Sequence, residues 1–324
     1  MNKIGLIIST HNGEKQMRKV AEWIIGQSGW AGPLIVIGSG DMRVELLRQR
    51  CSENSISFIY ESYIECGMAK RNRGAKLANE NSCNYIVFLN DYQSLEDGVL
   101  KNLELESLNE SIIFGSVEFE VGKELTPPRI SQHSLPLSRK SSISEVWSIF
   151  SSVSEAGLLI DTSIFLELKG WQHPIRKGVV CAGGTGMLLV GRAFSQGSDF
   201  GYSKNFRVLG GHRNLKIDES LALSRGAMYP YAFTLTARIK GVPVWLGLRF
   251  TLGRIVRLIQ QIIRRKSRIS NGEFIEISAR LRALLNLPPA RRASLLTKLT
   301  VDGCVASNFA CHKDGATQCY FRRL

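Results

Sequence analysis

The sequence lacks any uninterrupted apolar run of about 18 residues, the length that a membrane-spanning helix would need. It also lacks repeats, long low-complexity tracts and a visible secretory signal, because Met1 leads directly into a strand-like apolar segment. We therefore expect a cytoplasmic protein without a membrane-spanning helix. Any contact with a membrane should be peripheral, on its inner face.

Acidic side chains are scarce relative to basic ones. The 324 residues include 28 Asp and Glu against 42 Lys and Arg, which gives a net charge of +14. Such an excess favours anionic partners: nucleic acid, acidic membrane surfaces or phosphorylated ligands. Only the charge suggests nucleic acid, because the sequence has no helix-turn-helix signature and no basic sheet motif with interleaved aromatic residues. We expect no specific nucleic-acid binding.

The seven cysteines are odd in number and widely scattered, and none forms a Cys-x-x-Cys pair. This distribution argues against a disulfide framework and favours a reducing compartment. Near the end of the chain, Cys304, Cys311, His312 and Cys319 could bind zinc, but they lack the close spacing of zinc ligands. We favour the interpretation that these cysteines are small buried side chains.

The N-terminal part of the chain alternates between apolar strands and helices. Short apolar runs predict strands at 4–8, 34–37, 56–60 and 85–89, and apolar periodicity predicts helices at 17–26 and 44–51. This alternation predicts a parallel sheet covered by helices. The length allows one large domain or two modest ones.

The most informative stretch runs from Cys66 to Leu100. A loop at Gly67 leads into a helix whose early turns carry Lys70, Arg71, Arg73 and Lys76, and the buried strand 85–89 follows. The next residues are Asn90-Asp91-Tyr92, at the carboxyl end of the strand, where open α/β sheets bind their ligands. Basic groups beside an Asn-Asp pair predict a site for a nucleotide diphosphate, with an acidic edge for a metal or a hydroxyl. The alternative is a solvated basic helix next to an ordinary turn.

Three segments together resemble a known family. Ile4–Asn12 reads IGLIISTHN, Gly67–Asp91 runs from GMAKRNRG to FLND, and Ser154–Trp171 reads SEAGLLIDTSIFLELKGW. These motifs, in this order, resemble those of family-2 glycosyltransferases of GT-A fold, over roughly the first 240 residues. The resemblance implies an α/β fold with a mostly parallel nucleotide-binding sheet flanked by helices. It implies a GT-A-like domain at 1–235, and we expect a basic, amphipathic helical region at 236–324.

The resemblance also implies roles for residues on the donor side. In the family, the loop after the first strand contacts the base, the basic helix faces the diphosphate, and a late histidine contacts the metal or the diphosphate. The donor-binding candidates are therefore Thr10, His11, Asn12, Asp41, Lys70, Arg71, Arg73, Asn90 and His212. Asp91 and His212 are the metal-binding candidates, for Mn²⁺ or Mg²⁺. His212 could equally be a surface or core histidine without a function.

On the acceptor side, the segment GGTGMLLVGRAFSQG at 183–197 aligns with a family helix that begins with a Glu-Asp pair. The acceptor-binding candidates are Gly184, Thr185 and Gly186. The catalytic candidates are Asp91, Asp218 and Glu219, the last two as substitutes for the missing base. Asp218 and Glu219 could instead simply begin a helix.

The sequence departs from the family pattern at three acidic sites, which together comprise five residues. Val36 and Ile37 replace two aspartates, Thr185 and Gly186 replace the Glu-Asp pair, and Tyr92 replaces the last metal-binding aspartate. These losses suggest either a metal-independent transferase that uses Arg and Lys to stabilise the leaving group, or a relative without catalysis. Metal dependence and metal independence are both open.

The resemblance therefore implies a glycosyltransferase of the hexosyltransferase class. It would move a sugar from a nucleotide-sugar donor to a glycan or lipid-linked acceptor in surface polysaccharide synthesis. The alternative is a non-catalytic glycosyltransferase-like subunit that binds donor, glycan or a partner enzyme.

The segment from Tyr229 to Arg268 has a different pattern. Apolar side chains recur at three- and four-residue steps, at Trp245, Leu248, Leu252, Val256, Ile259 and Ile263, and arginines occupy other faces. This pattern predicts a basic amphipathic helix that lies on an anionic membrane surface. A helix packed on its own domain with a solvated basic edge would give the same pattern.

Overall fold

The computed structural model describes residues 2–10, 14–38, 43–63, 67–118, 127–133, 136–176, 179–180, 185–210, 236, 239–265, 274, 277–278, 280–282, 285 and 321–323. The chain divides into two compact units. The first comprises Met1–Trp171 with Gly197–Asn214, and the second comprises Gln172–Gln196 with Leu215–Leu324. The predicted domain boundary after residue 235 stays a prediction.

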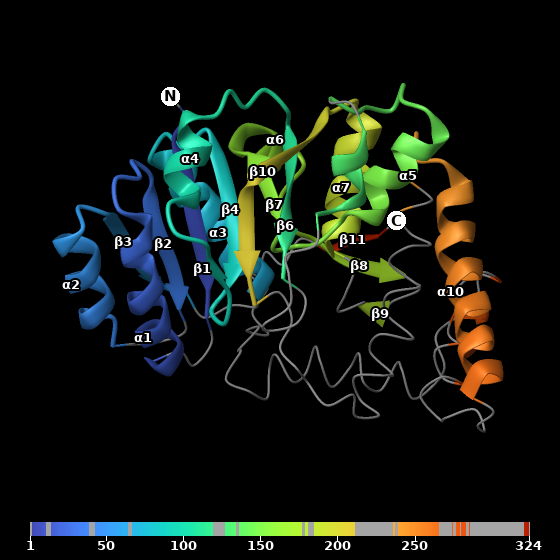
Figure 1. Ribbon diagram of the computed structural model, residues 1–324, viewed down its shortest axis with the longest axis horizontal. Coiled ribbons are helices and arrows are strands. Elements are labelled where there is room, and N and C mark those ends of the chain that lie inside the picture. Colours follow the sequence, from blue (N-terminus) through green and yellow to red (C-terminus); the bar gives the residue numbers. More distant parts are fainter. Residues whose placement is uncertain are drawn as a thin grey trace. The chain divides into compact units, whose positions relative to one another are not determined.

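The first unit is built on an eight-stranded sheet in the order β3-β2-β1-β4-β7-β6-β10-β5 (Figure 1). Its strands are β1 (Ile4–Ser9), β2 (Pro33–Gly38), β3 (Ser57–Ser62), β4 (Tyr85–Asn90), β5 (Ser94–Leu95), β6 (Ile112–Val117), β7 (Leu158–Asp161) and β10 (Phe200–Leu209). The strands β3, β2, β1 and β4 are parallel neighbours, β6 and β10 pair parallel, and β7 and β5 pair antiparallel with their neighbours. The predicted mostly parallel α/β sheet is confirmed.

Helices cover both faces of this sheet, as the continuous apolar runs predict. The helices of the first unit are α1 (Glu14–Trp23), α2 (Glu45–Glu53), α3 (Gly67–Glu80), α4 (Val99–Leu105), α5 (Ile143–Ser151) and α6 (Thr162–Glu167), with short 3₁₀ helices η1 (Ile24–Gln27) and η2 (Arg129–Gln132). On one face, Leu6 and Val87 share a core with side chains of α1, α2 and α4. On the other, the Phe88 ring packs against Phe165 of α6 and against Trp171. Both faces of β1 and β4 are therefore buried, so only the strand ends remain to bind a ligand.

The helix α3 approaches the sheet closely at Gly74. A Cβ atom at this position would lie 2.5 Å from Cγ2 of Ile7 in β1, a side chain that is completely buried. Only glycine allows this distance between helix and sheet. Because α3 carries Lys70 and Arg71, the close packing also fixes the position of these side chains relative to the strand ends.

We expect Gly74→Ala to lower the free energy of unfolding by about 1–3 kcal/mol, because the added methyl group overpacks the core. Gly253→Ala is the matched control, since no described atom lies within 4 Å of a Cβ placed there. In an exposed helix, this change should raise the stability slightly. Urea denaturation of the full-length variants measures both effects, and equal stability of the two variants would contradict the packing at Gly74.

The second unit contains a three-stranded sheet in the order β11-β8-β9, in which β11 pairs parallel with β8 and β9 pairs antiparallel. Its elements are β8 (His173–Arg176), β9 (Val179–Val180), α7 (Thr185–Gln196), α10 (Val244–Arg265) and β11 (Phe321–Arg323). Most of α7 is buried, including Leu189 and Phe194. Among the described residues, no helix is both long enough and apolar enough to cross a bilayer.

Candidate functional site

Two predicted site residues meet at the carboxyl ends of neighbouring strands. The strands β1 and β4 are parallel and in register, with Ser9 opposite Asn90, so the residues that follow them are neighbours. There the Thr10 hydroxyl donates a hydrogen bond to Oδ2 of Asp91, at 2.7 Å. Thr10 is completely buried, and its hydroxyl contacts an acidic group at this edge. The contact fixes the orientation of the Asp91 carboxylate.

Lys70 lies beneath the same edge. Its side chain is completely buried, and Nζ donates a hydrogen bond to the carbonyl oxygen of Thr10 at 2.8 Å. A buried ammonium group needs such partners, because leaving water is costly for a charge. Lys70 therefore connects the first turn of α3 to the backbone that follows β1.

Arg71 forms the centre of the described site. Its Nη2 donates to Oδ1 of Asn90 at 2.9 Å, and its Nη1 forms an ion pair with Oε2 of Glu155 at 3.1 Å. The guanidinium also lies over the Trp171 ring, 5.5 Å from its centroid. A planar guanidinium suits this combination of hydrogen bonding and stacking. Arg71 thereby joins α3, the end of β4 and the segment before β7.

Glu155 was not among the residues predicted from the sequence. Its side chain is about one-third exposed, whereas that of Arg71 is only 10% exposed. The Glu155 carboxylate thus supplies a negative partner to the Arg71 guanidinium at the strand end. Glu155 lies in the motif at Ser154–Trp171, but that motif does not pair it with Arg71, because the two residues are 84 positions apart.

The turn after β4 is organised by side-chain amides. Oε1 of Gln93 accepts hydrogen bonds from the backbone N–H of Asn90 at 2.8 Å and from its side-chain Nδ2 at 3.1 Å. The same Nδ2 also lies 3.1 Å from the Tyr92 hydroxyl. These contacts orient Asn90 so that its Oδ1 faces Arg71.

The phenol of Tyr92 remains protonated at neutral pH. Burial raises its pKa, and the negative charges of Asp91 and Glu155 add to this, while Arg71 acts in the opposite direction. A neutral phenol is a poor substitute for the carboxylate that the resembled family carries here as a metal ligand. Tyr92 therefore supplies a hydrogen-bonding hydroxyl to this edge.

Arg73, another predicted donor-binding residue, has different partners. Its Nε and Nη2 each lie 2.8 Å from an oxygen of Glu61 in β3, and its Nη1 lies 3.6 Å from Glu80. The hydrogen bonds that Arg73 donates to Glu61 raise the pKa of its guanidinium above its usual range. The described contacts bring Arg71, Asn90, Asp91 and Thr10 together but do not connect Arg73 to them.

The turn before Trp171 holds the ring beneath Arg71. Lys169 and Gly170 both have positive φ, 60° and 63°, and a Cβ at Gly170 would lie 2.3 Å from Oδ1 of Asn72. That oxygen accepts a hydrogen bond from the Trp171 backbone N–H at 2.8 Å, and Asn72 Nδ2 donates to the Trp171 carbonyl at 3.0 Å. Two neighbouring residues of α3 therefore contact this turn: Arg71 through the Trp171 ring and Asn72 through the Trp171 backbone.

Several predicted residues lie outside the described part of the chain: His11, Asn12, Asp41, Gly184, His212, Asp218 and Glu219. Thr185 and Gly186 are described, and they form the buried first turn of α7 in the second unit.

The described residues include no group of three or more His, Cys, Asp or Glu side chains that could hold a metal ion. Asp91 nevertheless offers one carboxylate, and Mg²⁺ is often bound through one or two carboxylates plus the phosphates of the substrate. Among the described residues, Asp91 therefore offers a carboxylate to a divalent cation, whose other ligands would come from a diphosphate, water or residues outside the described ranges.

Comparisons with known proteins agree on the fold. No family model matches the chain, and no curated protein matches it. Among solved structures, S. aureus TarS 1-349 in complex with UDP-GlcNAc is similar with a TM-score of 0.56 and 10% identity, over 95% of this chain and 88% of that one. The mannosyltransferase PcManGT from Pyrobaculum calidifontis, in complex with GDP-Man and Mn²⁺, is similar with a TM-score of 0.52 and 10% identity. That match covers 94% of this chain and 86% of PcManGT.

These neighbours are glycosyltransferases of GT-A type, and the likeness shows that this chain has the GT-A fold. The predicted fold resemblance is confirmed.

Proposed function

We propose that the protein is a glycosyltransferase that moves a sugar from a nucleotide-sugar donor to a glycan or lipid-linked acceptor in surface polysaccharide synthesis. The observation that carries this proposal is the Arg71–Asn90 hydrogen bond beside the Thr10–Asp91 pair, at the carboxyl ends of β1 and β4. In open α/β sheets, this edge is where ligands bind. The GT-A fold and the donors bound to the two neighbours support it.

On the donor side, Arg71 would contact the diphosphate and Asn90 the sugar, while Lys70 keeps the backbone after β1 in place. His11, Asn12, Asp41 and Arg73 would complete the nucleotide-binding surface. Sugar transfer requires that the departing diphosphate is stabilised as its negative charge develops. Arg71 is the described cation that is best placed for this role, because it already binds the oxygen of Asn90 at the strand end.

A divalent cation, where one is bound, would neutralise part of the diphosphate charge. Asp91 is the described residue that would hold it, with His212 as a second ligand. The Thr10 hydroxyl would keep the Asp91 carboxylate oriented in either case. The metal-independent route relies instead on basic side chains, with Arg71 as the described one at the strand end.

On the acceptor side, Gly184, Thr185 and Gly186 would contact the acceptor at the start of α7. The deprotonation of the acceptor hydroxyl would then fall to Asp218 or Glu219, or to Asp91. A base in this role typically contributes about 10²–10⁴-fold to the rate.

A non-catalytic binding subunit is the second candidate. It is favoured by the neutral Tyr92 beside Asp91 and by the ion pair that occupies Arg71. In such a protein, the strand end would bind a donor or glycan without turning it over.

A donor-hydrolysis screen separates the two candidates. The full-length chain is incubated with UDP-, GDP-, dTDP- and CMP-sugars, with Mn²⁺, Mg²⁺ or EDTA, and the released nucleotide is measured. We expect slow release from one class of donor, with little effect of EDTA, because a single described carboxylate is a weak metal site. Asp91→Asn should abolish any metal-dependent part of the rate.

The outcomes of this screen are distinct. Donor binding without release would favour the binding subunit. Strong metal-dependent turnover would assign the metal to Asp91 together with acids outside the described residues. Absence of binding to every donor would overturn the transferase and the donor-binding form of the second candidate.

We also propose that the protein works in the cytoplasm, at the inner face of the membrane. Cys51 and Cys83 are free and buried, as expected in a reducing compartment. Burial raises the pKa of these thiols to about 12 and about 11, respectively, so both stay protonated and unreactive.

A further inference from the structure

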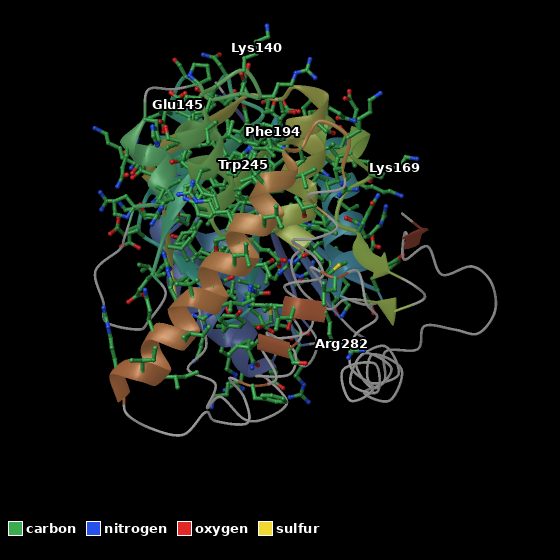
Figure 2. The ribbon with its side chains drawn as sticks, turned by 90° about the vertical axis from the view of Figure 1, so that its right-hand side faces the viewer. Lys140, Glu145, Lys169, Phe194, Trp245 and Arg282 are labelled. Atoms are coloured by element: carbon green, nitrogen blue, oxygen red, sulfur yellow. The ribbon has the colours of Figure 1, made fainter. Side chains whose placement is uncertain are left out.

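The helix α10 spans 22 residues, from Val244 to Arg265, and contains no acidic side chain. At about 1.5 Å per residue it is about 33 Å long. Figure 2 shows it as one continuous helix, with Trp245 near the end where it begins. It carries five arginines: Arg249, Arg254, Arg257, Arg264 and Arg265.

One side of α10 exposes large aliphatic side chains. They follow one another at steps of four or three residues, which places them along one stripe. The stripe consists of Val244, Leu248, Leu252, Val256, Ile259 and Ile263, each between 44% and 69% exposed. Leu246, Thr251 and Ile255 are buried, so the helix already packs through other positions. A continuous apolar stripe that stays exposed commonly marks an interaction surface.

The arginines border this stripe. With about 100° between successive residues, Arg249, Arg257 and Arg264 each follow a stripe residue and lie together along one edge. Apolar side chains in the middle and cations along the edge are the pattern of helices that lie in the interface of a membrane. The aliphatic groups enter the acyl boundary while the guanidinium groups stay at the level of the phosphates.

We propose that this stripe and its arginine edge form a binding surface for an anionic lipid bilayer. Charge decides between this partner and a second copy of the chain. Two copies of α10 packed through their stripes would bring arginines together without any acid in either helix, in a protein of net charge +14. An anionic bilayer supplies both the apolar layer and the negative charge.

This inference rests on α10 alone and does not depend on transfer activity. If the proposed function holds, the surface would keep the enzyme where lipid-linked acceptors are found. Failure of the donor screen would leave the membrane proposal untouched, and failure of vesicle binding would leave the donor site untouched.

Vesicle co-sedimentation of the full-length chain tests the proposal. One set of vesicles is phosphatidylcholine alone, and the other contains about 30% phosphatidylglycerol to supply a negative surface. We expect at least about tenfold tighter binding to the anionic set, weakened by about 0.5 M salt because the charge component is screened.

Two variants separate the apolar and charged parts, and both change only exposed positions. Leu252→Gln with Val256→Gln and Ile259→Gln removes half of the stripe, and Arg249→Gln with Arg257→Gln and Arg264→Gln removes the edge. Each should lower binding to anionic vesicles at least about tenfold. Gln260→Ala with Gln261→Ala is the matched control, and it should bind like the parent. Circular dichroism and thermal unfolding confirm that each variant is folded.

Equal binding to both vesicle sets, or unchanged binding of either triple variant, would overturn the proposal. Light scattering tests the alternative that a second copy of the chain binds this surface. If the parent forms a concentration-dependent dimer that the stripe variant loses, and if the parent does not sediment with vesicles, the surface is a self-association interface and the lipid assignment is wrong.

Discussion

Replacing Arg71 with alanine should weaken the binding of a nucleoside diphosphate by about 10- to 150-fold. A hydrogen bond to a charged group is worth about 1.5–3 kcal/mol, which corresponds to this range of affinity. The loss should be large because Arg71 is the described cation that contacts Asn90 at the strand end. Calorimetric titration of the full-length chain with UDP and GDP measures the effect.

Two other arginines make the Arg71 experiment specific. Arg18→Ala is the matched control, because Arg18 lies on the exposed side of α1 and pairs only with Glu14 among the described residues. Its affinity should equal that of the parent, since exposed ion pairs contribute little. Arg73→Ala tests the donor-binding role predicted from the sequence. Unchanged affinity in a folded Arg71→Ala variant would remove this helix from the nucleotide site.

Replacing Glu155 should change the nucleotide affinity in the opposite direction, in the same titration. Its carboxylate neutralises Arg71, so a diphosphate that binds Arg71 has to replace it. Glu155→Gln keeps the size of the side chain and removes the competing charge, so the affinity should rise. The rise should disappear in Arg71→Ala with Glu155→Gln, because the two residues act through one contact. If Glu155→Gln instead lowers the affinity, the carboxylate supports donor binding by orienting Arg71.

The sequence predicts the parallel half of the sheet because burial on both faces leaves a simple signal. The strands β1, β2 and β4 are almost uninterrupted apolar runs, and helices separate them. The same logic brings Thr10 and Asp91 together, since the carboxyl ends of neighbouring parallel strands meet at one edge. The contact between these two side chains is a direct consequence of this topology.

The other half of the sheet, from β7 to β5, carries weaker signals, and β10 was not predicted. Its sequence FGYSKNFRVL places Lys204, Asn205 and Arg207 within the strand, and its pairing with β6 shifts register between Tyr202 and Arg207. Such an irregularity breaks the strict alternation on which strand prediction depends. The helix α5 was also missed, although Ser142 and Glu145 form a capping box at its start. That local motif could have identified it.

The site residues, like the strands, fall into those that the sequence predicts and those that only the structure identifies. Arg71 and Asn90 could be predicted because each belongs to a motif within a regular element. Glu155 and Trp171 lie in the motif at Ser154–Trp171, but they contact Arg71 from a distant part of the chain, once β7 has joined the sheet and α6 has packed on it. Long-range pairs of this kind leave no periodic pattern in a single sequence, so only the structure reveals them.

Replacing Trp171 with alanine should lower the free energy of unfolding by about 3–5 kcal/mol, the range for truncating a large buried aromatic side chain. Trp171 is almost completely buried, and its ring packs at steep angles against Phe88 and Phe165, with centroids 5.3 and 6.0 Å away.

Trp171→Phe is the matched variant and should lose much less stability. It keeps an aromatic ring in the cluster, and it removes an indole N–H that has no hydrogen-bond partner among the described residues. Urea denaturation of the full-length variants measures both changes. A loss below about 1 kcal/mol in Trp171→Ala would mean that the cluster is not part of the stable core. If the phenylalanine variant is folded but binds UDP or GDP more weakly than the parent, the indole ring also positions Arg71, as expected from a cation–π contact that is stronger for tryptophan than for phenylalanine.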